Sequence, residues 1–338
     1  MKDVFLTKKK IKIKNISYGT AVLGNYYDIY GNKQVSEVLN HAYESGINYF
    51  DTAPLYGFGL SEHRLGHFLQ QINRDNYVLS SKVGRLLNPH NTSNIDRGPW
   101  KGGLNFNPYF DYSYEGTMRG IEASMQRLGI SKIDILHIHD VDYFTHKEKH
   151  LVDKYFKEAI NGTYKALDEL RKNNIISAIG LGLNEHEMAQ RFINEIDIDC
   201  VMLAGRYTLL EQNSLKEFFP LCQQKQIDVI LAAPFNSGIL AGTIENLNWN
   251  YAKASNEIIT KVDNIKKICD SYKVPLPAAA LQFPLLNPII KTVVTGAVNK
   301  KELNDNINYL NIEIPKDLWN ELKDLNLINK ESPIVSLS

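Results

Sequence analysis

Four ionisable side chains stand where short apolar stretches of the sequence end. Asp51 closes the run YFD and Tyr56 follows it beyond Pro54, while Lys82 closes SSK and His139 closes ILHIH. A tyrosine hydroxyl, with an ordinary pKa of about 10, is a poor acid or base at neutral pH. A lysine ammonium placed against it stabilises the phenolate and lowers the pKa of the hydroxyl. Tyr56 and Lys82 can therefore form a proton-transfer pair if the fold brings them together.

The other two side chains complete this chemistry. A buried lysine needs a counter-ion to stay charged, and Asp51 is the nearest plausible carboxylate. His139 can donate a hydrogen bond to a substrate oxygen and orient it. Taken alone, each residue has an ordinary structural explanation, such as turn capping for Asp51 or an ammonium extended to solvent for Lys82. Their joint occurrence at successive strand ends favours a catalytic site.

Apolar runs alternate with helical patterns along the whole chain. Apolar runs flanked by helices indicate buried parallel strands. About eight strand–helix units in 338 residues predict an α/β fold, a closed (β/α)8 or TIM barrel, with residues 1–338 as a single domain. The expected strands lie at residues 15–24, 49–53, 76–84, 132–140, 175–183, 199–207, 228–235 and 289–297. The expected helices lie at residues 33–46, 61–72, 113–129, 162–173, 185–195, 215–225, 256–272 and 300–310.

The alternative is an open doubly wound sheet. Its dinucleotide fingerprint needs a third glycine, and the stretch GLGLNE at residues 180–185 has Glu185 there. The sequence therefore favours the closed barrel, whose chemistry lies at the C-terminal ends of the strands.

Three segments stand outside the strand–helix alternation. Residues 4–15, in which Ile and Lys alternate within the stretch KKKIKIK (residues 8–14), predict an N-terminal β-hairpin that caps the bottom of the barrel. Residues 84–112 form a long βα loop, and loops of that length are usually functional or disordered. The aromatic residues of this loop favour a binding lid; they are Trp100, Phe106, Tyr109 and Phe110. A second insertion, at residues 140–162, is expected to be irregular.

The composition of the chain limits the kinds of binding partner to expect. The chain has 38 Lys+Arg and 38 Asp+Glu residues, a balance that does not favour nucleic acid or an anionic membrane as partner. No apolar run approaches the ~20 residues of a membrane span, and the first residues lack a signal-peptide pattern. Three isolated cysteines predict reduced core thiols in a cytoplasmic protein; they are Cys200, Cys222 and Cys269. We expect a small-molecule substrate, and the oligomeric state stays open.

A metal centre is a weaker hypothesis. His137 and His139 share one strand face, and this spacing also occurs among metal ligands. The other histidines do not close a later strand, so further ligands are missing. We expect no metal and interpret His137 as an interior residue or as a support for the site.

Several segments resemble the aldo-keto reductase family. The stretches GINYFDTAPLYGFGLSEHRLG, SSKVG and MQRLGISKIDILHIHD are similar to the regions that hold its Asp–Tyr–Lys–His tetrad, and the resemblance extends from about Gly19 to Asn306. It implies a barrel with nicotinamide bound across the strand ends and with Asp51, Tyr56, Lys82 and His139 as the catalytic residues. The stretches KVGRLL and LAGRYTLLEQ resemble a branch of sugar and pyridoxal dehydrogenases.

The resemblance also implies a set of cofactor contacts. Gly19, Thr20 and Ala21 correspond to positions at the nicotinamide ribose, and Tyr207 to an aromatic ring stacked on the nicotinamide. Positions around the pyrophosphate correspond to Asn236, Ser237, Gly238 and Leu240. Positions in the final strand-to-helix segment, near the adenine, correspond to Gly296, Ala297, Glu302, Asp305 and Asn306.

Other positions depart from the family pattern. Many relatives place Ser-Asn after the fifth strand, where this chain has Gly182 and Leu183, so that Asn184, one place later, is expected to bind the carboxamide. The glutamine that many relatives carry on the sixth strand is Ala204 here.

Two departures bear on the choice of cofactor. Val298 replaces the arginine common in NADP-preferring members, and Glu302 occupies another position that is often basic. A carboxylate suits a free ribose diol and repels a phosphate, so NAD is expected in preference to NADP. Lys300 and Lys301 would partly compensate if they pointed inward.

The resemblance implies hydride transfer between nicotinamide and an aldose lactol of the L-fucose or D-arabinose type, giving the lactone, or pyridoxal. Trp100, Tyr56 and His139 are expected to contact the substrate. Two alternatives stay open: a general NADPH-dependent aldehyde or ketone reductase, and a redox-sensing regulatory barrel, because some relatives are channel-associated subunits.

Overall fold

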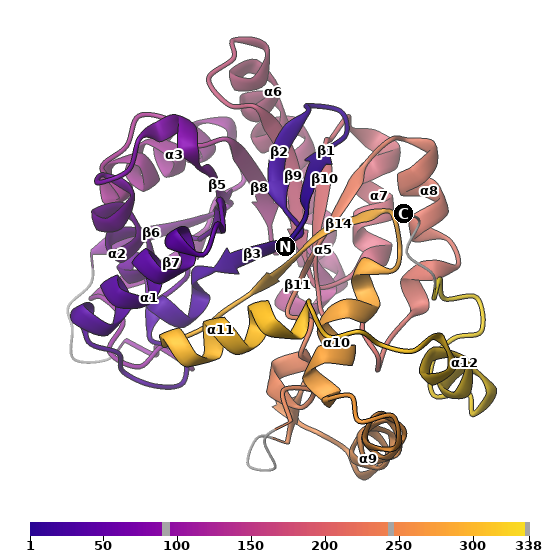
Figure 1. Cartoon of the computed structure of the whole chain (residues 1–338). Helices are drawn as coiled ribbons and strands as arrows, with labels where there is room; N and C mark the ends of the chain where they lie inside the picture. Colours follow the sequence, from indigo (N-terminus) through magenta and orange to yellow (C-terminus); the bar gives the residue numbers. More distant parts are fainter. Residues whose placement is uncertain (90–94, 243–246, 335–338) are drawn as a thin grey trace.

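Eight parallel strands close into a barrel in the order in which they occur in the chain (Figure 1). The computed structural model describes residues 1–89, 95–242 and 247–334. The last strand pairs with the first, so the predicted (β/α)8 barrel is confirmed. The barrel strands are β3 (Ile16–Gly19), β4 (Tyr49–Asp51), β5 (Val78–Val83), β8 (Ile135–His139), β9 (Ala178–Leu183), β10 (Cys200–Ala204), β11 (Asp228–Ala232) and β14 (Ile290–Thr295).

Helices surround these strands on the outside (Figure 1). Their boundaries follow local signals: α3, for example, begins after Ser113, whose side chain accepts a hydrogen bond from Gly116 N, and ends at Gly129 with a φ of 63°. The helices found where the sequence predicts them are α1 (Asn32–Glu44), α2 (Leu60–Leu69), α3 (Tyr114–Leu128), α6 (Tyr164–Lys172), α7 (His186–Glu195), α8 (Phe218–Gln224), α9 (Asn256–Ser271) and α11 (Lys300–Tyr309). Short 3-10 turns are η1 (Thr20–Gly24), η2 (Arg74–Asn76), η5 (Asn213–Leu215) and η6 (Asn236–Gly238).

Two further helices, α10 (Leu276–Leu285) and α12 (Lys316–Asp324), are not predicted from the sequence. The segment LPAAALQFPL of α10 is apolar around nearly its whole circumference and is mostly buried, so it lacks the one-sided pattern that marks a surface helix. Pro277 lies in the first turn, where a missing N–H breaks no helical hydrogen bond.

The expectation of an irregular insertion at residues 140–162 is wrong. Helices α4 (Tyr143–His146) and α5 (Lys149–Glu158) fill this segment, and a π-helical turn, η4 (Ala159–Thr163), leads into α6. Val152 and Phe156, four residues apart in α5, are both buried against the barrel. This spacing is the apolar stripe that holds the helix in place.

The predicted N-terminal hairpin is confirmed. Strand β1 (Asp3–Leu6) pairs antiparallel with β2 (Ile11–Lys14). Leu6 and Ile13 belong to the cluster of buried side chains that includes Tyr49 of β4. Thr7 Oγ1 donates to Asp228 Oδ1 (2.8 Å), at the start of β11. The hairpin therefore closes the N-terminal end of the barrel.

The long loop at residues 84–112 carries a second antiparallel pair, β6 (Arg85–Pro89) with β7 (Phe106–Phe110). Its residues 90–94 lie outside the described part of the chain. A third pair, β12 (Asn248–Trp249) with β13 (Ala252–Lys253), follows η6 and is not predicted from the sequence. The three loops that carry η1, β6–β7 and β12–β13 all leave the C-terminal ends of barrel strands.

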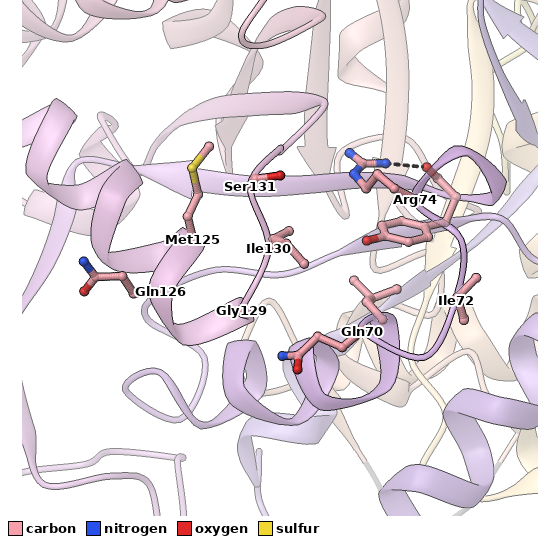
Figure 2. Close-up of a pocket in the computed structure, with 10 residues that line it drawn as sticks. Gln70, Ile72, Arg74, Met125, Gln126, Gly129, Ile130 and Ser131 are labelled. Atoms are coloured by element: carbon pink, nitrogen blue, oxygen red, sulfur yellow. Dashed lines mark hydrogen bonds between the residues drawn. The ribbon is translucent and has the colours of Figure 1, made fainter.

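Figure 2 shows a surface hollow of about 590 Å³ between the end of α2 and the turn that follows α3. Arg74 lines it and donates to the backbone oxygen of Tyr77 (2.9 Å) and to Asp134 Oδ2 (2.6 Å). Tyr77 and Asp134 directly precede β5 and β8, so the hollow lies at the N-terminal end of the strands. Barrel enzymes do their chemistry at the other end.

None of the helices in the described ranges is long and apolar enough to cross a membrane.

Candidate active site

Asp51 and Lys82 form a buried ion pair at the C-terminal ends of adjacent strands β4 and β5. Lys82 Nζ lies 2.7 Å from Asp51 Oδ2 and also donates to the backbone oxygen of Thr52 (2.8 Å). Both charged side chains are almost fully buried. Strand β8, which ends in His139, pairs with the other edge of β5. The prediction that three neighbouring strands bring these side chains together is therefore confirmed.

Tyr56 reaches the same place from the turn that follows β4. Lys82 Nζ lies 4.8 Å from the centroid of the Tyr56 ring. The turn is fixed by a close approach of two backbone segments: a Cβ on Gly57 would lie 2.5 Å from the oxygen of Gly24. Gly57 also has a φ of 63°, a conformation that favours glycine. The contact between these two glycines holds Tyr56 over the ion pair.

The expected lowering of the Tyr56 pKa is wrong for this arrangement. Burial raises the pKa of the Tyr56 hydroxyl well above 10, and the carboxylates of Asp51 and Asp140 raise it further. Lys82 lies over the face of the ring, and its hydrogen bonds go to Asp51 and Thr52. Because Asp51 balances the charge of Lys82, the hydroxyl gains little from it and stays protonated at neutral pH.

Two further side chains support Asp51 from below. Ser80 Oγ donates to Asp51 Oδ1 (2.6 Å), and the Tyr49 hydroxyl donates to Ser80 Oγ (2.9 Å). All three side chains are buried. Sequence reasoning missed Tyr49 and Ser80. Tyr49 precedes Asp51 by two residues, and Ser80 precedes Lys82 by two residues, so each shares a strand face with the later residue. They form a hydrogen-bonded chain that orients the carboxylate toward Lys82.

His139 is a neutral imidazole in the site. Burial lowers its pKa well below 6.5, and the charges of Lys82 and Arg85 lower it further. Nε2 lies 3.4 Å from Asp140 Oδ1, whereas Nδ1 is buried with no hydrogen-bond partner among the described residues. A neutral ring carries one N–H, which can serve as a hydrogen-bond donor.

His137 lies in the interior of the barrel. Its side chain is fully buried, and a Cβ on Gly180 would lie 2.2 Å from its Nδ1, so the neighbouring strand must carry glycine there. Within the described ranges, no three His, Cys, Asp or Glu side chains gather in an arrangement that could hold a metal ion.

An aromatic rim covers Tyr56. Trp100 of the long loop stacks on its ring at 5.5 Å, and Tyr26 packs against Trp100 at 4.8 Å. Tyr251, in the turn between β12 and β13, packs on Phe144 at 5.6 Å. Tyr251 is 45% exposed and belongs to the loop that follows β11, at the same end of the barrel as Tyr56.

A second buried ion pair borders the site and was not foreseen from the sequence. Arg85 Nε donates to Asp140 Oδ2 (2.8 Å), and Nη2 lies 2.8 Å from the same oxygen. The guanidinium lies over the Phe110 ring at 4.4 Å. Arg85 follows the end of β5 by two residues and Asp140 directly follows β8, in the stretches KVGR and HIHD. Opposite charges at neighbouring strand ends are the signal that could have revealed the pair.

Most of the residues expected to contact the cofactor lie at the same end of the barrel as Tyr56. Asn236 has features that fit a ligand with hydroxyl groups: its Nδ2 donates to Gly205 O (3.1 Å), while its buried Oδ1 has no partner within the described residues. The expected contacts that follow strands β3, β9, β11 and β14 are Gly19, Thr20, Ala21, Asn184, Asn236, Ser237, Gly238 and Gly296.

Three of the expected contacts need correction. Tyr207 is 0% exposed, stacked on Phe283 (5.2 Å) and edge-on to Phe219 (4.9 Å), so it offers no free face to a nicotinamide ring, and this prediction is wrong. The side chains of Leu240 and Ala297 belong to the hydrophobic core, so only their backbone atoms can reach a ligand.

The start of α11 is organised by hydrogen bonds of its own residues. Glu302 accepts from Val298 N (3.0 Å) and Asn299 Nδ2 (2.9 Å), and its own N–H donates to Asn299 Oδ1, so Asn299 caps the helix. Lys301 pairs with Asp305 (2.8 Å), and its side chain is 86% exposed, so it points outward. Asn306 Nδ2 lies 3.4 Å from the backbone oxygen of Gly296.

Known proteins resemble the chain over almost its whole length. The model described as "Aldo/keto reductase family" matches residues 15–327. Pyridoxal 4-dehydrogenase of Microbacterium luteolum is 38% identical over 337 residues, covering 96% of this chain and 97% of the relative. D-threo-aldose 1-dehydrogenase of a Pseudomonas species is 37% identical, covering 94% and 95%. An aldo-keto reductase from Bacillus halodurans, solved in its holo form, has a TM-score of 0.74 at 21% identity, covering 96% of each chain.

Proposed function

Because the chain belongs to the aldo/keto reductase family, we propose that it transfers a hydride between nicotinamide and an aldose lactol or pyridoxal. Family membership makes the chain an NAD(P)-dependent oxidoreductase. The main observation that supports the proposed hydride transfer is the buried Asp51–Lys82 pair beneath Tyr56, with His139 on the next strand. The relatives named for pyridoxal and for D-threo-aldose support the two substrate classes.

Each of the four residues has a part in the proton transfer. In the oxidation of a lactol to a lactone, Tyr56 accepts the proton of the hydroxyl group, and in reduction it returns the proton to the carbonyl oxygen. The neutral His139 ring donates a hydrogen bond to that oxygen. Lys82 and Asp51 supply a fixed pair of charges beneath the Tyr56 ring. When bound, the nicotinamide supplies the carbon that accepts or gives the hydride.

We propose that residues at the strand ends hold the cofactor. The unpaired Asn236 Oδ1 and the exposed Gly296 backbone support this assignment. NAD is the proposed preference, on the basis of Val298 and Glu302. The proposed contacts are Gly19, Thr20, Ala21, Asn184, Asn236, Ser237, Gly238, Gly296, Glu302, Asp305 and Asn306, with Leu240 and Ala297 contributing backbone atoms.

Glu302 allows a direct test of this preference. Glu302→Gln keeps a side-chain oxygen that can accept a hydrogen bond at the start of α11 but removes a negative charge, so it is expected to raise the kcat/KM ratio of NADP⁺ to NAD⁺ about fivefold. That factor corresponds to the ~1 kcal/mol between two charges about 4 Å apart in water. The exposed Glu313→Gln, with the same change in net charge, should leave the ratio unchanged. An equal response of both variants, or none, would argue against the assignment.

Because Ser80 donates a hydrogen bond to Asp51, we expect Ser80→Ala to lower activity, whereas the same substitution at Ser81 should not. Ser80→Ala and Ser81→Ala each remove a buried hydroxyl that donates to a carboxylate, Asp51 for Ser80 and Glu62 for Ser81. Each is expected to lower the free energy of unfolding by about 1–3 kcal/mol. Only Ser80→Ala should also lower kcat, because only its carboxylate contacts Lys82. Urea unfolding and initial rates measure the two effects, and equal kcat values would refute the role given to Ser80.

A substrate panel tests the proposed function. Initial rates are measured with NAD⁺ and NADP⁺ on L-fucose, D-arabinose and pyridoxal, and with NADH and NADPH on simple aldehydes. We expect NAD-linked oxidation of an aldose or of pyridoxal. Faster NADPH-linked reduction of the aldehydes would instead identify a general reductase. A lack of turnover across the panel, with a stoichiometric partner on purification, would identify a regulatory barrel.

We further propose that residues 1–338 act as one unit in the cytoplasm. Cys200, Cys222 and Cys269 are free and buried, which supports a reducing compartment.

A further inference from the structure

Asp140 is a charged residue at the site that the proton-transfer scheme does not use. It directly follows β8, has a φ of 58° and is 6% exposed. Its Oδ1 lies 3.4 Å from His139 Nε2, and its charge is close enough to raise the pKa of Tyr56. The carboxylate therefore lies beside the two groups that would contact the reacting oxygen of a substrate.

The two oxygens of this carboxylate differ in their surroundings. Arg85 Nε donates a hydrogen bond to Oδ2 (2.8 Å), and Arg85 Nη2 lies 2.8 Å from the same oxygen. The guanidinium is itself held between Asp140 and the face of the Phe110 ring. Asp140 N also donates to Gly182 O (3.0 Å). The backbone and one oxygen are thus anchored, and the other oxygen is directed toward His139.

The surroundings of His139 indicate which of its nitrogens carries the proton. Nδ1 is buried without a partner among the described residues, so a proton there would be a buried donor left unpaired, which is costly. A proton on Nε2 instead lies on the side of the ring nearest Asp140 Oδ1, at an N–O distance of 3.4 Å, which is too long for a good hydrogen bond and leaves the proton available to a substrate oxygen. The site thus presents a donor, Nε2–H, and an acceptor, Oδ1, side by side, at a spacing close to that between neighbouring oxygens of a polyol.

We propose that Asp140, held by Arg85, selects substrates with a hydroxyl group on the carbon next to the reacting carbon. His139 Nε2–H binds the reacting oxygen, and Asp140 Oδ1 accepts a hydrogen bond from the neighbouring hydroxyl. In an aldose lactol this is the 2-hydroxyl. Pyridoxal has no hydroxyl on the corresponding carbon, so this inference, which rests on the proposed function, assigns the site to sugars.

The test compares two sugars that differ only in the 2-hydroxyl, D-arabinose and its 2-deoxy form. The wild-type protein is expected to favour D-arabinose in kcat/KM by about tenfold or more, the range of a hydrogen bond to a charged group. Asp140→Asn should reduce this ratio at least fivefold, and Asp140→Ala should bring it to about one. Because both sugars are measured on the same preparation, partial unfolding of a variant cancels in the ratio.

Asp134 provides a matched control at the other end of β8. It is 7% exposed and pairs with Arg74 at 2.6 Å, as Asp140 pairs with Arg85. Asp134→Asn is therefore expected to lower stability and to leave the ratio unchanged. A ratio that Asp140→Asn leaves unchanged, or a wild-type ratio near one, would overturn the inference.

A second substrate pair separates this inference from the proposed function. If neither sugar is oxidised, reduction of lactaldehyde and of propanal, which lacks the neighbouring hydroxyl, is compared in the same variants. A preference for lactaldehyde that Asp140→Asn removes would refute the sugar substrate and support the role of Asp140. Equal effects on both aldehydes would overturn that role, and a lack of turnover of either pair would overturn both proposals.

Discussion

Replacing Tyr56 with phenylalanine is expected to lower kcat by about 10²–10⁴-fold while leaving the Kd of the dinucleotide nearly unchanged. The substitution removes only the hydroxyl that exchanges the proton. The ring, which stacks on Trp100 and has the Lys82 ammonium against its face, is retained. Steady-state rates and fluorescence titration with NADH measure the two quantities. Tyr26→Phe, the same change on another ring that packs against Trp100, should have a much smaller effect on kcat.

The pH dependence of the wild-type enzyme follows from the same hydroxyl. Burial, Asp51 and Asp140 raise the pKa of Tyr56 well above 10. Oxidation needs the deprotonated form, which becomes more abundant as pH rises toward that pKa, so the rate of oxidation should increase throughout the range from neutral to alkaline. Reduction needs the protonated form, which predominates below the pKa, so its rate should not fall over the same range as pH decreases. Oxidation that is independent of pH, or a Tyr56→Phe variant with wild-type kcat, would contradict this role.

The largest combined effect on activity and stability is expected for Lys82→Met. The substitution leaves the buried Asp51 carboxylate without its counter-ion, which typically costs about 3–5 kcal/mol of stability. It also removes the cation from the face of the Tyr56 ring, so kcat should fall as well. The double variant Asp51→Asn/Lys82→Met removes both charges, and the amide oxygen introduced by Asp51→Asn can still accept the hydrogen bond from Ser80.

The double variant separates the two effects. Its free energy of unfolding in urea should recover most of the loss, because no unpaired charge stays buried, whereas its kcat should remain low. Recovery of kcat in the double variant would show that the ion pair serves folding alone. Wild-type stability of Lys82→Met would show that Asp51 finds another partner.

The sequence predicts the barrel and the positions of Asp51, Lys82 and His139 well, for a physical reason. In a parallel barrel, consecutive strands are neighbours, so residues that end consecutive strands meet at one end. The position of Tyr56 near this end of the barrel follows because the residue comes only a few positions after Asp51 in the sequence. These inferences need only the order of the elements, which the alternation of apolar runs and helical patterns provides.

Features that depend on the direction of a single side chain could not be predicted in this way. Tyr207 lies beyond the end of β10, where Gly205 has a φ of 67° and breaks the alternation of inward and outward positions. Its ring consequently packs among helices. For the Arg85–Asp140 pair, the opposite charges at neighbouring strand ends give a signal in the sequence, but the contact itself depends on the positive φ of Asp140 and on the β6–β7 ladder.

The pKa of Tyr56 illustrates a different limit. The residue types indicate that a lysine lies near the hydroxyl, but the sign of the shift is a sum over burial and every nearby charge. Burial and the carboxylates of Asp51 and Asp140 raise the pKa of Tyr56. The Lys82 ammonium, whose charge Asp51 balances, does not offset this rise. The burial of the hydroxyl and its distances to the nearby charges are known only from the three-dimensional structure.

The N-terminal hairpin has a practical consequence for handling the protein. Leu6 and Ile13 share a buried cluster with Tyr49, whose hydroxyl begins the chain of hydrogen bonds that leads through Ser80 to Asp51. A purification tag or a deletion at the amino terminus therefore acts on the bottom of the same barrel whose other end carries the chemistry. Enzyme engineers who wish to vary the upper loops should leave this end untouched and attach tags elsewhere.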